Sequence, residues 1–232
     1  MSGALQQRAR ATRRALLEEA ARLFAERGYA GTSVNDISTR SGRTSGSVYF
    51  HYASKEGIAL AVVKDAFATW PHLGARYADR SVPPLDRLVS LSFEIAHALI
   101  EDTVVRAGAR LWAERDTIDA PLPDPFTLWT AATTRLLAQA RATGHLAHRV
   151  RPAIVAPALV RAFFGLCTLT EALEDRRLVA ARLADWWHIT LPFLQGDTDS
   201  TGVLSRARAQ QMVPTMRRIP AAAPVQHSTA IP

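Results

Sequence analysis

The chain has 232 residues, enough for a large hydrophobic core and for one or two domains. Its 28 lysine and arginine residues outnumber 21 aspartate and glutamate residues, which gives a formal net charge of +7 at pH 7 and suits a surface that binds phosphate groups. A single cysteine excludes a disulfide framework, and the sequence has no uninterrupted apolar run of about 18 residues. We therefore expect a soluble, cytoplasmic protein that does not bind a membrane.

An amphipathic helix is predicted for residues 8–27, where apolar residues recur with helical spacing. Four arginines precede or flank its start, namely Arg8, Arg10, Arg13 and Arg14. Two interpretations stay open for them. They form either the solvated start of a helix or an N-terminal arm that contacts phosphates or the minor groove of DNA.

Residues 28–56 contain two very short helical patterns on either side of one tight turn. Thr32 or Ser33 can cap the first helix, and Asp36 lies where a capping-box acid would stand relative to Ser33. Gly42 ends this helix at a position that needs a positive φ. Two short helices joined by such a turn form a helix-turn-helix, the motif by which many proteins read DNA.

The second short helix is predicted from about Thr44 to His51. Its first turn is small and polar, which lets a helix approach base edges closely, and contains Thr44, Ser45 and Gly46. The side chains that follow carry hydrogen-bond donors suited to phosphate oxygens, and these are Tyr49, His51 and Lys55. The pattern predicts that the first turn of this helix contacts bases and that the residues after it contact the DNA backbone.

The segments G-Y-x-G-T-S-V-x-D-I and T-x-G-x-V-Y-F-H-Y-x-S-K-E resemble the DNA-binding domain of the tetracycline-repressor (TetR) family of transcriptional regulators, over about residues 10–65. The resemblance implies base contacts from Thr44, Ser45 and Gly46, and phosphate contacts from Ser33, Tyr49, His51 and Lys55. Many members have lysine in place of Ser45 and an apolar residue in place of Arg43. We expect Arg43 to read guanine instead, a contact that contributes about 1–3 kcal/mol of discrimination. The operator sequence therefore does not follow from relatives.

The remaining pattern is helical throughout, with helices expected at about 55–70, 84–101, 103–115, 125–143, 151–174 and 176–194. Few stretches alternate with period two, so a sheet is not expected. The prediction is an all-α fold. It consists of a three-helix DNA-binding domain with its arm at 1–54, a larger ligand-binding and dimerisation domain at 55–195 that begins with the linker helix 55–70, and a flexible tail at 196–232 with a short helix near 205–212.

The second domain has more large aromatic residues than a thin helical layer needs for packing. Phe126, Trp129 and Thr133 share one predicted helical face. Such faces usually form core, yet an aromatic cavity with few polar atoms is also the usual small-molecule site. The residues expected to bind a ligand are Phe67, Phe93, Trp112, Phe126, Trp129, Thr133 and Phe163.

A narrower resemblance lies in V-V-R-A-G-A-R-L (104–111) and P-L-P-D-P-F-T-L-W (121–129), which are similar to the γ-butyrolactone autoregulator receptors of streptomycetes, a TetR subgroup that controls antibiotic production. It implies that Trp129 lines a ligand pocket and that a diffusible γ-butyrolactone- or butenolide-like signal releases the repressor from a palindromic operator. Some relatives carry polar groups in place of Phe67, Trp112 and Phe126, which favours a more apolar ligand or a pseudo-receptor that answers an antibiotic.

The same resemblance implies a homodimer formed by the last two helices. The residues expected at this contact are Phe163, Phe164, Leu166, Leu183, Trp186, Trp187 and Leu191. A two-fold dimer would place two reading helices one DNA turn apart.

An enzyme is not expected, because the seven histidines lack metal-ligand spacing and no phosphate loop or G-x-S-x-G motif occurs. No cofactor or metal is expected either. The alternative within the DNA-binding class is a protein without a small-molecule switch, in which the aromatic residues simply pack.

Overall fold

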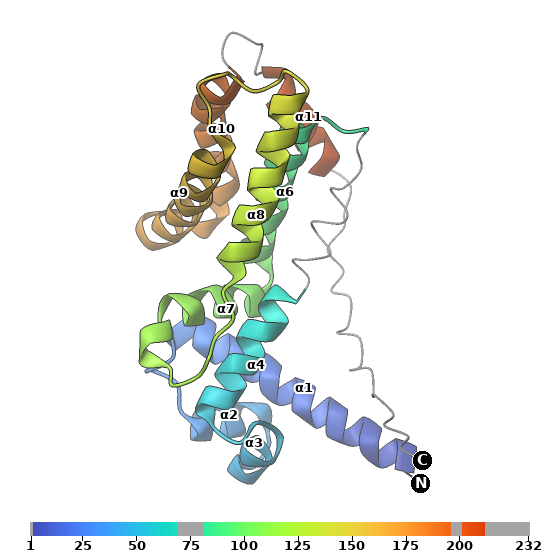
Figure 1. Ribbon diagram of the computed structural model, residues 1–232. Coiled ribbons are helices and arrows are strands. Elements are labelled where there is room, and N and C mark those ends of the chain that lie inside the picture. The colour runs from blue at the N-terminus through green and yellow to red at the C-terminus, as the bar shows by residue number, and fades with distance from the viewer. Residues whose placement is uncertain (1, 69–80, 196–200, 212–232) are drawn as a thin grey trace, which may run out of the picture.

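The computed structural model describes residues 2–68, 81–195 and 201–211, and within these ranges all regular structure is helical (Figure 1). The N-terminal helices are α1 (Ser2–Arg27), α2 (Val34–Ser41), α3 (Ser45–Tyr52) and α4 (Lys55–Phe67). The later helices are α6 (Pro84–Glu101), α7 (Thr103–Ala113), α8 (Pro125–Ala142), α9 (Pro152–Leu173), α10 (Val179–Gln195) and α11 (Thr201–Gln211). The all-α prediction is confirmed.

Three helix starts differ from the sequence prediction by three residues or more, among them that of α11, which begins at Thr201 instead of about 205. Helix α1 begins at Ser2 instead of residue 8, so residues 2–7 are helical and form no extended arm. Helix α10 begins at Val179, after a 3₁₀ turn at Arg176–Leu178 that takes up the first residues expected for it. The expected end of the linker helix at 70 lies outside the described residues.

The helix-turn-helix is built by its predicted caps. Asp36 accepts the backbone N–H of Ser33 at 2.9 Å, and the Ser33 hydroxyl oxygen accepts the N–H of Asp36 at 3.1 Å, which closes a capping box at the start of α2. Gly42 has φ +63° and lets the chain reverse into α3. The Thr44 hydroxyl oxygen caps α3 by accepting the N–H of Ser47 at 3.2 Å.

Two apolar cores divide the molecule into a lower and an upper part (Figure 1). The lower core joins α1–α4, and α7 contributes to it through residues that include Val104, Ala107 and Leu111. The upper core joins α6 and α8–α11. A Cβ at Gly108 of α7 would overlap the Cβ of Ala66 in α4, so these two helix backbones cross very closely. Helix α7 therefore packs as part of the DNA-binding half, although it lies in the sequence of the second domain.

The segment expected to be a flexible tail contains a packed helix. In α11, the residues Val203, Leu204 and Ala207 are buried in the upper core. Arg206 Nε donates to Asp86 Oδ1 at 2.5 Å, and Asp86 is 1% exposed. The short helix expected near 205–212 is present as α11, but it packs against α6 instead of lying free in a tail. Residues 196–200 and 212–232 lie outside the described ranges.

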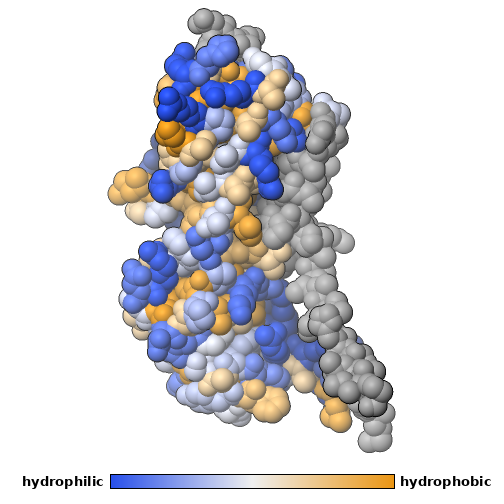
Figure 2. All heavy atoms as spheres, in the orientation of Figure 1, coloured by the Kyte–Doolittle hydropathy of each residue, from blue (hydrophilic) through white to orange (hydrophobic). Residues whose placement is uncertain are grey.

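Helix α9 is long and apolar enough, by length and composition, to cross a membrane: it has 22 residues, and its most apolar 18-residue window has a mean hydropathy of 1.8. It lies beside α8 and α10 in the helical upper part, and only 33% of its most apolar window is buried there. Apolar residues reach the surface on the side where α9 lies (Figure 2). Residues 2–68, 81–195 and 201–211 thus leave much of this apolar helix uncovered.

Candidate DNA-binding surface and ligand cavity

The predicted base-reading residues lie together at the start of α3. Arg43, Thr44 and Gly46 are exposed, and Ser45 is half-buried because its hydroxyl lies 3.1 Å from that of Ser38 in α2. The Ser33 and Thr44 hydroxyls are engaged in the two helix caps. Arg43 consequently has the longest uncommitted side chain at this helix end, which fits the guanine-reading role expected of it.

The predicted phosphate contacts follow along α3 and into α4. Tyr49 is 55% exposed and His51 is half-buried on α3. Lys55 Nζ lies 4.0 Å from the centre of the Tyr29 ring, and the Tyr29 hydroxyl donates to Glu56 Oε1 at 2.6 Å. Desolvation lowers the pKa of Lys55, with the nearby carboxylates of Glu56 and Glu114 opposing the effect. The ammonium is thus held in a fixed place beside α3.

One further residue on this surface was not expected from the sequence. Phe50 is 83% exposed, the most exposed large apolar side chain in the described part of the chain. Its neighbours Val48 and Tyr52 point into the core, so helical spacing alone places Phe50 on the outer face. An exposed aromatic residue on a reading helix suits apolar contact with a thymine methyl group or a sugar.

A basic groove of about 850 Å³ lies between α1, α3 and α4. Its basic lining residues are Arg10, Arg13, Arg14, His51 and Lys64. Asp65 also lines it and lies 3.3 Å from Arg14. The arginines flanking the first helix thus lie beside the reading helix, where positive charge favours the DNA backbone.

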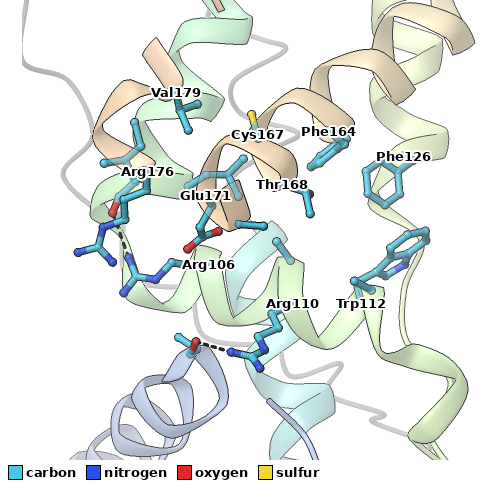
Figure 3. Close-up of a pocket in the computed structure, with 16 residues that line it drawn as sticks. Arg106, Arg110, Trp112, Phe126, Phe164, Cys167, Thr168, Glu171, Arg176 and Val179 are labelled. Carbon is cyan, nitrogen blue, oxygen red and sulfur yellow. Dashed lines mark hydrogen bonds between the residues drawn. The ribbon is translucent and has the colours of Figure 1, made fainter. Parts of the chain in front are cut away.

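A cavity of about 450 Å³ lies between α7, α8 and α9, where the two parts of the molecule meet (Figure 3). One side is an aromatic wall in which Phe126 is 4.2 Å from Trp112 and 4.3 Å from Phe164, between ring centres. Cys167 also lines the cavity, and burial raises the pKa of its thiol to about 12, so the thiol stays neutral. The volume is typical of a small-molecule site, about 300–1,000 Å³.

The seven residues expected at the ligand site lie in different parts of the structure. Trp112 and Phe126 line the cavity. Trp129 and Phe163 form a second layer behind it, with Trp129 5.0 Å from Phe164 between ring centres. Phe67 belongs to the lower core and Phe93 to the upper core, and neither lines this cavity. Phe164 lines it and was missed, because helical spacing does not show which of two adjacent phenylalanines faces inward.

Thr133 lies one helical turn after Trp129 on α8 and is 1% exposed. Its hydroxyl oxygen has no hydrogen-bond partner among the described residues. A buried, unpaired hydroxyl is costly, but Thr133 is not among the residues that line this cavity.

The residues expected at the dimer contact are largely internal. Phe163, Leu183, Trp187 and Leu191 are at most 1% exposed and form the upper core, so this part of the prediction is wrong. The apolar side chains that α9 and α10 expose are different ones, namely Ile154, Leu169, Leu173, Ile189 and Phe193. Core and exposed apolar residues alternate along the same two helices, and apolar spacing alone did not distinguish them.

A helix-turn-helix joined through a closely packed pair of helices to a larger helical bundle with a cavity defines a class of protein, the bacterial one-component transcriptional regulators. Residues 16–62 match the bacterial regulatory proteins of the tetR family, and residues 82–194 match the tetracyclin repressor-like C-terminal domain. The chain belongs to the TetR family.

Among its relatives is the A-factor receptor protein of Streptomyces griseus, which is 31% identical over 82% of this chain and 66% of the receptor. The crystal structure of a γ-butyrolactone receptor (ArpA-like protein) is 29% identical, with a TM-score of 0.74 over 89% of this chain and 100% of that one. CprB from Streptomyces coelicolor in complex with its operator sequence is 31% identical, with a TM-score of 0.74 over 88% of this chain and 98% of CprB. The similarity therefore extends over both domains.

Proposed function

We propose that this protein is a cytoplasmic, homodimeric repressor that binds a palindromic operator and is released by a small diffusible signal. The observation that carries the proposal is the position of α7. One face of α7 lines the cavity through Trp112, and another packs against α4 at Gly108. A molecule that shifts α7 must therefore also shift α4, which leads directly from the reading helix.

The mechanism is a linkage between two sites. A ligand that favours a displaced α7 moves α4 and changes the spacing of the two reading helices, which must lie about 34–36 Å apart to enter successive major grooves. By the same linkage, bound operator weakens ligand binding by an equal factor. A coupling of about 1–3 kcal/mol, roughly 5–150-fold in affinity, is enough to release the operator.

The relatives support one class of signal. A γ-butyrolactone or butenolide has a small polar ring on an alkyl chain, and the aromatic wall of Trp112, Phe126 and Phe164 can cover such a chain. The similarity to the A-factor receptor and to a γ-butyrolactone receptor supports this class. Control of antibiotic biosynthesis is the corresponding biological role that we propose.

Footprinting of the DNA upstream of the protein's own gene, with and without extract of the producing culture, tests the proposal directly. We expect protection of a palindrome that the extract abolishes, and we expect Trp112→Ala to make the complex resistant to the extract. A palindrome that stays protected in every extract would leave a DNA-binding protein without a small-molecule switch and would refute the proposal.

The expected role of Arg43 is tested on the same DNA. Arg43→Ala should weaken operator binding by about 1–3 kcal/mol and relax the preference for guanine at one position, because a bidentate contact is lost. Arg135→Ala is the matched control, since Arg135 is exposed on α8, far along the chain from the reading helix. Equal effects of the two substitutions, measured by fluorescence anisotropy with operator and point-mutated operators, would show that Arg43 contributes only charge.

A further inference from the structure

One end of the cavity is lined by charged side chains, in contrast to its aromatic wall. Three arginines line this end: Arg106 and Arg110 from α7, and Arg176 from the 3₁₀ turn before α10 (Figure 3). Glu171 of α9 is the one carboxylate among the lining residues. Arginine stays charged at any pH at which the protein is folded, so this end carries a net positive charge.

Two of these arginines have donors to spare. Arg106 and Arg110 are one helical turn apart, so they project from the same side of α7. Arg106 Nη1 donates to the carbonyl of Ile100 at 3.0 Å, and Arg110 Nη1 donates to the carbonyl of Ala25 at 2.9 Å. A guanidinium has five N–H donors in a planar fork, which leaves each residue able to bind a carboxylate as well.

Building on the proposed regulation by a small diffusible signal, we propose that this signal carries an anionic group, so that it is an amphipathic acid instead of a neutral lactone. Its apolar body would pack against Trp112, Phe126 and Phe164, and its anionic group would bind between Arg106 and Arg110. Charge-assisted hydrogen bonds to arginine are about twice as strong as neutral ones. An acid therefore has an advantage over a neutral molecule with the same apolar body.

Arg110 also connects the cavity to the DNA-binding half. Its Nε donates to Glu114 Oε1 at 3.0 Å, and Glu114 Oε2 accepts the backbone N–H of Tyr29 at 2.6 Å. Together with the bond to Ala25, these contacts fasten the end of α7 to the turn that leads into α2. An anion that binds the remaining donors of Arg110 draws the guanidinium away from Glu114 and from the Ala25 carbonyl, so the same group that gives affinity loosens this fastening.

Decanoate and methyl decanoate are suitable probes, because they share an alkyl chain and differ in charge. Their binding to the full-length protein is measured by calorimetry at neutral pH. We expect decanoate to bind at least about tenfold more tightly than the ester, as one strong charged hydrogen-bond pair provides. The double variant Arg106→Gln, Arg110→Gln should lose this preference, whereas Arg135→Gln, which removes a charge outside the cavity, should keep it.

A second variant covers the case in which the double variant fails to fold. Glu171→Gln removes the competing carboxylate and should tighten decanoate binding severalfold without changing binding of the ester. Equal affinity for the two probes, binding of neither, or a preference that survives the arginine substitutions would overturn the inference. Release of the operator by only the neutral fraction of the culture extract would reject the acid and leave the proposed regulation intact, whereas failure of every fraction would reject both.

Discussion

At the scale of single residues, two glycines allow the cost of backbone strain to be compared with the cost of losing a specific contact. Gly28 and Gly42 have φ +74° and +63°, so alanine is strained at both positions. A Cβ at Gly42 would meet nothing within 4 Å, but one at Gly28 would lie 2.5 Å from Glu114 Oε1. Both substitutions therefore cost backbone strain, but only the one at Gly28 also disturbs Glu114.

We predict that Gly42→Ala lowers the free energy of unfolding by about 1–2 kcal/mol, the cost of a left-handed residue with a side chain. Gly28→Ala should cost at least about 1 kcal/mol more, because Glu114 must leave the Tyr29 N–H that it accepts at 2.6 Å. Urea denaturation at equal protein concentration measures both. Equal losses would show that the contact between Glu114 and Tyr29 does not contribute to stability.

The sequence predicted well those residues whose structural role depends only on nearby positions in the chain. The capping box of Ser33 with Asp36 and the turn at Gly42 depend on neighbours a few positions away, so spacing alone identifies them. The ligand cavity depends on how far α7, α8 and α9 stand apart. The separation of these helices places Trp112 and Phe164 on the wall of the cavity and Trp129 behind them. No local sequence pattern predicts that separation.

At the scale of elements, α11 shows how an ion pair fixes a helix that has little apolar periodicity of its own. Arg206 reaches from α11 to the buried Asp86 of α6. The sequence of residues 201–211 is mostly polar and small, and the partner of Arg206 lies 120 positions earlier. For this reason the packing of α11 could not be predicted from local pattern, whereas the strongly amphipathic α6 and α7 were placed almost to the residue.

We predict that Arg206→Ala lowers the free energy of unfolding by about 1–3 kcal/mol, because it leaves a buried carboxylate without its charged partner. Arg206 is itself 55% exposed in its side chain, which keeps the figure below that of a fully buried pair. Arg40→Ala is the matched control, since Arg40 pairs at 2.8 Å with a Glu26 side chain that is half exposed. Its loss should cost much less, because solvent screens an exposed pair. A similar loss for both would indicate that the Asp86 pair is no stronger than a surface pair.

At the scale of the whole molecule, the described part of the chain leaves the apolar surface of α9 and α10 uncovered. Leu169 and Leu173 are 58% and 77% exposed on α9, one helical turn apart. Ile189 and Phe193 are 77% and 52% exposed with the same spacing on α10, and the two helices pack together. A two-fold dimer needs a face that can pack against its own copy, and we propose that these two stripes form that face.

We predict that the double substitution Leu173→Glu, Ile189→Glu converts the protein to a monomer that keeps its helical circular dichroism, because buried glutamates cannot be paired across the contact. Sedimentation equilibrium measures the mass. Leu128→Glu is the control: Leu128 is 62% exposed, but on α8, and its substitution should leave the dimer intact. The monomer should bind operator far more weakly than the dimer, since it loses the second half-site. A double variant that stays dimeric would place the contact on another surface, and the spacing of the two reading helices would then have to be set by helices other than α9 and α10.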